Sequence, residues 1–313
     1  MVTWNDLFTQ GTLIDYSVHL WRARLRITAD DLGIGNTEEV KKAISLGCHR
    51  LAPSEAFDDI NTIVRGWNKD IEDHSFCFPM LQGVRYVPDS EVEDLKEKIN
   101  DRMKSFEIAV AKFLEKYDQI QNEMLPVIEE ALTEAAKTPE AARVALERVR
   151  SEYPAKEKIA TKFGLEWNFF TISIPTSKEA ALAAKDSIPQ VQRVVQSMVE
   201  QLRNELSEKV SNLINLAEKG KSGTSRSKDG IGEQSKQSAL TVLDKVDRLN
   251  IFGDSVLSDQ ISNLRRLLKS DYTLDSVVTD LSQIKGNLES NIADAAAQAQ
   301  KKLTGLGNRK IQL

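Results

Sequence analysis

The chain has 313 residues, of which 41% are hydrophobic, 28% are charged and only 6% are aromatic. This balance is typical of a folded protein and excludes a wholly disordered chain. The formal net charge of −5 lacks the basic excess that nucleic-acid-binding proteins usually show. No apolar run reaches the length of about 18 residues that a membrane-spanning helix requires, so no association with a membrane is expected.

The two cysteines, Cys48 and Cys77, indicate the compartment. Residues 1–6 have neither the basic nor the apolar region of a secretory signal. Two thiols without such a signal are typical of reduced, intracellular proteins. We therefore expect the protein to be cytoplasmic.

Residues 1–88 predict the first part of a small α/β head. Apolar and polar residues alternate with period two over 14–27, which is typical of a strand. The phase of the alternation changes at 20–21, which indicates a bulge or the start of a second strand. Two short aromatic and β-branched runs within 76–87 flank a glycine and predict a β-hairpin.

The strongest pattern in the chain predicts a long helix over 89–137. From Met103 onward its apolar residues are spaced alternately by three and four, as in a heptad seam. The regular part is roughly 50–60 Å long at 1.5 Å per residue, well above the usual length of a helix in a globular protein. Pro126 is expected to kink or interrupt its end. The main seam positions are Met103, Phe106, Val110, Phe113 and Tyr117.

Residues 138–176 predict a helix and a strand that complete the head, and the strand is apolar enough to be central in a sheet. A second long helix, over 177–219, has a length similar to that of the first. Its strongest seam positions are Met198, Leu202, Leu206, Val210 and Leu213.

Composition changes abruptly at 220–236, where Gly, Ser and Lys predict a flexible linker. The C-terminal region, 237–313, predicts three helices, the last over 272–303. The predicted fold is mainly α with a small α+β head, a long antiparallel coiled-coil-like helical stalk and a C-terminal helical bundle. The alternative is that the two seams pair between chains.

No motif for catalysis is present. The sequence has no Walker A pattern and no G-x-S-x-G. Acidic pairs such as Asp30–Asp31 are expected on solvated helix faces and caps. A zinc site would have to combine Cys48, His49, His74 and Cys77, yet adjacent side chains on a helix point apart. We therefore predict no catalytic residue, no cofactor and no metal.

Three arginines, Arg22, Arg24 and Arg26, share one face of the first predicted strand at intervals of about 7 Å. Guanidinium groups in such a row bind phosphates or an acidic partner surface, and Trp21 beside them offers a stacking surface. The simpler explanation is that the arginines pair with carboxylates of the head itself.

The head motifs resemble an uncharacterised family, a domain of unknown function found in phages, prophages and bacteria. The resemblance is closest over 1–175 and offers no catalytic residues to carry over. It rests on Gly11–Asp15, Trp21, Asp30–Gly33, Phe76–Pro79 and Arg85–Pro88, followed by Tyr117 and Met124–Pro126 in the long helix. Members are often encoded beside a MoxR-type AAA+ ATPase and a von Willebrand A-domain protein, which implies both as partners.

Sequence and resemblance together predict a non-enzymatic, phage-encoded interaction or assembly protein. It would self-associate, as a homo-oligomer, or dock through its long helices, and work with an AAA+ ATPase in the cytoplasm of a bacterial host. The alternative is a nucleic-acid-binding accessory protein that uses the arginine face. A metal-dependent enzyme is a third possibility with weaker support, because the acidic pairs are common in a chain with 47 Asp and Glu residues.

Overall fold

The computed structural model describes residues 7–32, 47–172, 188–222, 231–270, 273–290 and 292–307. The chain divides into two compact units, each built from segments that are far apart in the sequence. We call 1–15, 71–95 and 168–313 the bundle unit, and 16–70 and 96–167 the ribbon unit.

The sheet has four strands in the order β4-β5-β1-β6. In the bundle unit β5 pairs antiparallel with β1 and β4, and Tyr86 lies opposite both Leu13 and Phe76. The predicted hairpin is therefore confirmed. The strand predicted to be central is β6, at the edge of the sheet, and in it only Leu165 is buried. The strands are β1 (Gly11–His19), β4 (Phe76–Cys77), β5 (Arg85–Pro88) and β6 (Gly164–Phe170).

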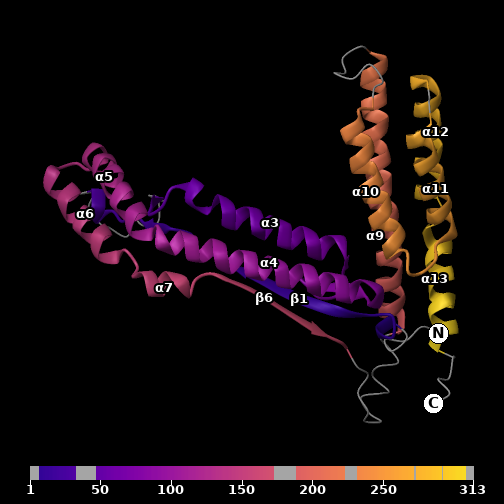
Figure 1. Cartoon of the computed structure of the whole chain (residues 1–313), viewed down its shortest axis with the longest axis horizontal. Helices are drawn as coiled ribbons and strands as arrows, with labels where there is room; N and C mark the ends of the chain where they lie inside the picture. Colours follow the sequence, from indigo (N-terminus) through magenta and orange to yellow (C-terminus); the bar gives the residue numbers. More distant parts are fainter. Residues whose placement is uncertain are drawn as a thin grey trace, which may run out of the picture. The chain divides into compact units, whose positions relative to one another are not determined.

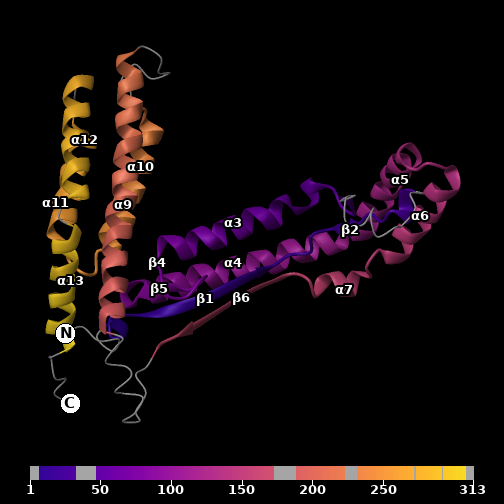
Figure 2. The same cartoon turned by 180° about the vertical axis from the view of Figure 1, so that it is seen from behind.

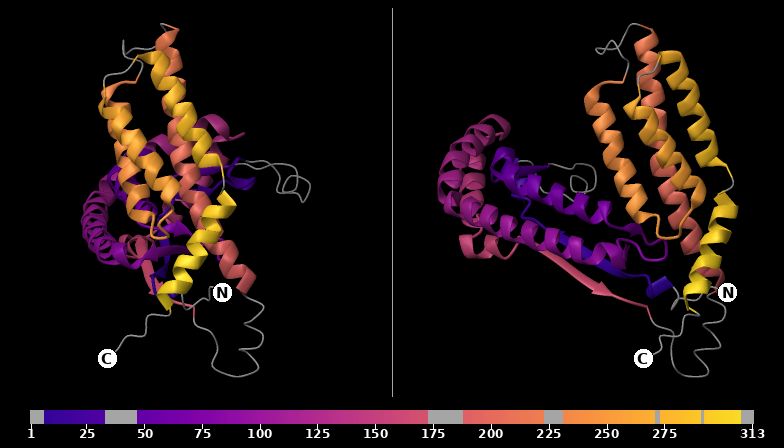
Figure 3. Two further views of the ribbon diagram at one scale, coloured as in Figure 1. Left: turned by 90° about the vertical axis from the view of Figure 1, so that its right-hand side faces the viewer. Right: turned by 45° about the vertical axis from the view of Figure 1, so that its right-hand side comes forward.

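Among its described residues, the bundle unit also contains five helices from α9 onward, and each is amphipathic. Helix α9 packs against α10, α12 and α13, while α11 packs against α10 and α12. Figure 3 shows α9 to α12 lying side by side. The helices are α9 (Ile188–Lys221), α10 (Glu233–Leu249), α11 (Ser255–Lys269), α12 (Leu274–Glu289) and α13 (Ile292–Gly307).

The apolar seam of α9 is fully buried inside the bundle unit. Its predicted positions, from Met198 to Leu213, are at most 2% exposed and share one core with residues such as Leu243 and Leu281 of the following helices. We expected this seam to face the first long helix in an antiparallel stalk. It faces α10, α12 and α13 instead, because these helices carry apolar stripes that must be buried at the same time. The sequence predicts 177–219 and 237–313 as separate parts. The described residues of both ranges belong to the bundle unit.

The last predicted helix, 272–303, is two helices. Ser290 is extended, with φ −84° and ψ 151°, and ends α12. The guanidinium of Arg203 donates through Nη1 to the carbonyl oxygens of Leu288, at 3.4 Å, and of Ser290, at 2.6 Å. This contact satisfies carbonyl groups that a helix end leaves without partners, which explains a break that helical periodicity does not reveal.

The ribbon unit contains a two-stranded antiparallel sheet, β2 (Arg24–Arg26) with β3 (Cys48–Arg50), and most of the two helices α3 (Asp58–Asp73) and α4 (Asp89–Glu115). Figures 1 and 2 show α3 lying along α4. An ion pair from Arg102 Nε to Asp70 Oδ2, at 2.7 Å, joins them. Its described residues also form η1 (Asp30–Leu32), η2 (Ser54–Phe57), α5 (Tyr117–Ala135), α6 (Pro139–Glu152) and α7 (Lys156–Ala160).

The helix predicted over 89–137 is interrupted at Lys116 and not at Pro126. Pro126 lies inside α5. The interruption falls between Phe113 and Tyr117, whose rings both pack on Trp21. Tertiary packing of these rings therefore sets the direction of the chain at this point, and the local preference of proline does not.

The chain is mainly α with a small α+β part, as predicted. In the part of the chain that the structure describes, no helix combines the length and apolarity that crossing a membrane demands.

Candidate functional site: an apolar groove and an arginine ribbon

Aromatic residues hold the ribbon unit together around Trp21. The centroid of its ring lies 6.2 Å from Phe57, 6.0 Å from Phe113 and 5.8 Å from Tyr117. Phe113 in turn contacts Phe163 at 5.6 Å. Trp21 is therefore a packing residue of this cluster, which leaves it a poorer stacking surface than the sequence alone predicts.

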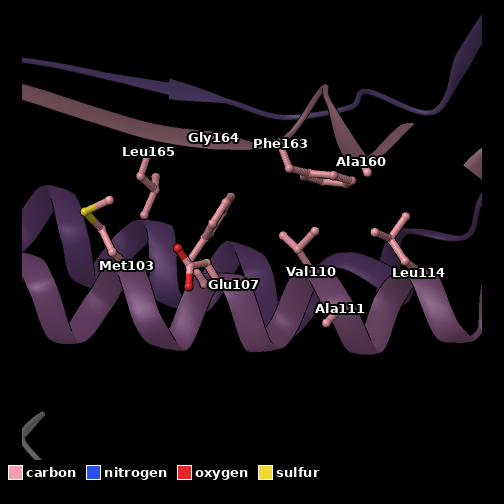
Figure 4. Close-up of a pocket in the computed structure, with 10 residues that line it drawn as sticks. Met103, Glu107, Val110, Ala111, Leu114, Ala160, Phe163, Gly164 and Leu165 are labelled. Atoms are coloured by element: carbon pink, nitrogen blue, oxygen red, sulfur yellow. The ribbon is translucent and has the colours of Figure 1, made fainter. Parts of the chain in front are cut away.

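An apolar groove of about 380 Å³ lies between α4 and the segment that joins α7 to β6. Figure 4 shows Met103, Val110 and Leu114 pointing from the helix toward the opposite wall, on which Phe163 and Leu165 lie. Helix α4 contributes Met103, Phe106, Glu107, Val110, Ala111 and Leu114, and the opposite wall contributes Ala160, Phe163, Gly164 and Leu165.

The seam predicted for the first long helix is only partly buried by its own unit. Phe106, Phe113 and Tyr117 are at most 4% exposed. Met103 and Val110 are half-buried and line the groove. The seam of α4 thus differs from that of α9, since part of it lines an open groove.

Three further features shape the groove and its rim. Trp167 Nε1 donates to Met103 Sδ at 3.3 Å and so fixes that flexible side chain. Glu107 is exposed and places a carboxylate among apolar neighbours. Ile108 is 57% exposed and lies about 60° around the helix from Ala111, so an apolar surface continues past the rim.

The second candidate feature, the arginine ribbon, consists of Arg24, Arg26 and Arg50 on β2 and β3. Arg24 lies directly opposite Arg50, and Leu25 lies opposite His49. All three arginines are exposed, whereas His49 is buried. Because successive side chains of a strand point to opposite faces, the three guanidinium groups share the solvent face. None of them forms an ion pair with another described residue, so the pairing that the sequence favoured is absent there.

Arg22 stands apart from this face. Ala23 is buried and has a φ of +48°, which is uncommon for a residue other than glycine. Its carbonyl oxygen accepts from Leu51 N at 2.8 Å. The alternation expected over 22–26 is interrupted there, and β3 supplies Arg50 in place of Arg22. No local signal in the sequence identifies Arg50, since its position depends on strand pairing.

An ion pair between the half-buried Arg148 and the buried Asp31 anchors the ribbon on α6. Arg148 donates through Nε to Asp31 Oδ1 at 2.8 Å and through Nη2 to Asp31 Oδ2. The same Nη2 donates to the carbonyl oxygen of Arg26 at 3.0 Å. Burial acts to raise the pKa of the Asp31 carboxyl, but hydrogen bonds from Thr28 and Arg148 outweigh it and hold the pKa below its usual value. Asp31 is therefore ionised at neutral pH.

The match to known families spans both units. A model of proteins of unknown function, DUF3150, matches residues 9–293. The chain belongs to the DUF3150 family. No curated protein and no solved structure matches it. Because the family match includes α4, β2 and β3, the groove and the ribbon both lie within the DUF3150 region.

His49 is the buried titratable group beneath the ribbon in this DUF3150 chain. Its buried Nε2 has no hydrogen-bond partner among the described residues, and burial lowers its pKa. Within the described ranges, no group of three or more His, Cys, Asp or Glu side chains is placed to hold a metal ion. Cys48 and His49 belong to the ribbon unit, whereas His74 and Cys77 belong to the bundle unit.

Proposed function

We propose that this DUF3150 protein is a non-enzymatic interaction protein whose docking surface is the apolar groove of α4. The observation that carries the proposal is the contrast between the two long helices. The seam of α9 is buried within the bundle unit. In contrast, Met103, Val110 and Leu114 of α4 line a groove that the ribbon unit leaves open.

The groove has the properties of a protein-binding site. Its walls are mostly apolar, and a partner side chain that enters it is removed from water, which stabilises a complex by about 25 cal/mol per Å² of buried apolar surface. A few buried anchors of this kind supply most of the energy of an interface. Glu107 adds a carboxylate that favours a partner with a basic residue next to its apolar anchor.

The proposed partner is a MoxR-type AAA+ ATPase, with a von Willebrand A-domain protein as a second one. This part rests on the resemblance to a phage and prophage family whose genes are often adjacent to theirs. The chain has no Walker A sequence, so a partner would supply any work driven by ATP. We further propose that the protein is encoded by a phage and acts in the cytoplasm of a bacterial host.

The first test is Val110→Asp, which puts a charge on the wall of the groove. Loss of a buried anchor costs an interface about 2 kcal/mol or more, so affinity for the purified ATPase should fall roughly 30-fold, as measured by titration calorimetry. The matched control is Val144→Asp on α6, where the valine is 52% exposed and outside the groove.

Equal affinities of the ATPase for wild-type protein and Val110→Asp would contradict docking in the groove. Equal losses in both variants would also contradict it. Light scattering over a concentration series measures self-association in the same samples. If Val110→Asp dissociates an oligomer and the ATPase fails to bind the wild-type protein, the groove joins copies of the chain and the ATPase part of the proposal is wrong.

A further inference from the structure

The arginine ribbon carries an inference that is independent of the groove. We propose that Arg24, Arg26 and Arg50 bind the phosphate backbone of double-stranded DNA. Three cations share one exposed face of a two-stranded sheet, in a chain whose formal net charge is −5. Affinity for DNA depends on such local positive charge, because phosphate contacts release condensed counterions.

The spacing of the three guanidinium groups favours a polyanion. Arg24 and Arg26 are two residues apart on one strand, or about 6.8 Å. Arg50 lies directly opposite Arg24, where Cβ atoms are separated by about 5 Å. Like charges at these separations repel one another when no anion is present. A ligand with closely spaced negative charges relieves the repulsion at all three positions.

The main chain of the ribbon is also held in place before a ligand binds. Main-chain hydrogen bonds extend it at both ends, from Ile27 N to Gly47 O at 3.2 Å and from Leu51 N to Ala23 O at 2.8 Å. Arg148 donates to the carbonyl oxygen of Arg26 and so holds the end of β2 in place. Arginines on a rigid base lose less conformational entropy when they bind a ligand than those on a mobile loop.

The geometry favours DNA over two other polyanions. The major groove of B-DNA, about 12 Å wide, admits a two-stranded β-ribbon, whereas that of duplex RNA is too narrow for side chains to read. An acidic protein carries carboxylates on flexible side chains without a regular repeat. Phosphates present bidentate acceptors at a fixed repeat, which matches the planar guanidinium group.

The test compares two triple variants with the same change in charge. One is Arg24→Gln/Arg26→Gln/Arg50→Gln. The control is Arg65→Gln/Arg143→Gln/Arg150→Gln, in which the three arginines are also exposed and belong to the ribbon unit. Fluorescence anisotropy over a salt series measures the binding of a labelled DNA duplex, with duplex RNA and polyglutamate as competitors.

We expect the wild-type protein to bind the duplex at low salt. The ribbon variant should bind at least about tenfold more weakly. The slope of log K against log salt is negative, and its magnitude should decrease by about 0.9 for each lost phosphate contact, or roughly 2.7 in all. The control variant should keep the wild-type affinity and slope. Circular dichroism checks the fold of both variants, and Arg50→Gln alone replaces the triple variant if the latter does not fold.

Three results would overturn the inference. The first is the absence of salt-sensitive DNA binding by the wild-type protein. The second is an equal loss in the ribbon variant and the control, which would reflect net charge alone. The third is competition by polyglutamate or duplex RNA as effective as that by unlabelled DNA, because it would assign the ribbon to an acidic protein or to RNA.

Discussion

At the scale of single residues, the deepest charge in the bundle unit is Arg203, with a side chain only 1% exposed. It donates to both carboxylate oxygens of Asp254, through Nε at 2.6 Å and through Nη2 at 2.9 Å. Asp254 also accepts from Leu257 N at 3.2 Å and so caps α11. The opposite charges and the hydrogen bonds of this pair offset the cost of burying it. The same contacts join three elements: α9, the start of α11 and the end of α12.

Arg203→Met should therefore destabilise the protein. It leaves the Asp254 carboxylate buried without its cation, which costs about 3–5 kcal/mol. Unfolding in urea, followed by circular dichroism, measures the loss. Arg193→Met on the exposed side of the same helix is the control and should change the free energy of unfolding by less than about 0.5 kcal/mol. Similar unfolding curves for the two variants would contradict a stabilising role of the pair.

His49 predicts a dependence of stability on pH. Burial lowers its pKa in the folded state, while the unfolded chain binds the proton near the usual value of about 6.5. The unfolded state thus binds more protons below this value, and stability falls as the pH decreases through it. His49→Leu should reduce the difference in urea midpoint between about pH 7.5 and about pH 5.5. A difference unchanged in His49→Leu would refute the assignment.

At the scale of elements, two glycines illustrate opposite constraints. A Cβ at Gly11 of β1 would lie 2.3 Å from the carbonyl oxygen of Val87 and 2.7 Å from the ring of Tyr86. A Cβ at Gly286 of α12 would meet nothing within 4 Å. Gly11 is thus required by strand packing, while Gly286 only lowers the helix propensity.

Gly11→Ala should lower the free energy of unfolding by about 1–3 kcal/mol through overpacking. Gly286→Ala should raise it by about 0.5–1 kcal/mol, because alanine favours the helix. Thermal denaturation of the two variants beside the wild-type protein checks both signs. A stabilised Gly11→Ala would show that β1 and β5 pack less tightly than these distances indicate.

Element ends were the least predictable feature. Thr138 does cap α6 by accepting from Ala141 N at 3.2 Å, and its position before Pro139 announces a helix start. The breaks at Lys116 and Ser290 have no such sequence signal. They depend on a ring cluster and on a buried arginine, respectively, and these form only when distant segments meet.

At the scale of the whole molecule, each unit combines distant segments of the chain. The ribbon unit takes 16–70 and 96–167, and the bundle unit takes the remainder. The DUF3150 match at 9–293 spans both. Linear boundaries drawn from composition therefore separate residues that pack together, as happened with the second long helix and the C-terminal region.

The sequence by itself determined the fold class, the hairpin, most helices and the amphipathic stripes, because these follow from local periodicity and turn residues. It also placed Arg24 and Arg26 on one strand face. Only the tertiary structure decided which stripe stays open, and that Arg50 joins the ribbon while Trp21 packs among other rings. The physical reason is that helical or strand periodicity indicates which side of an element is apolar. Which neighbouring element covers that side depends on how all elements pack together.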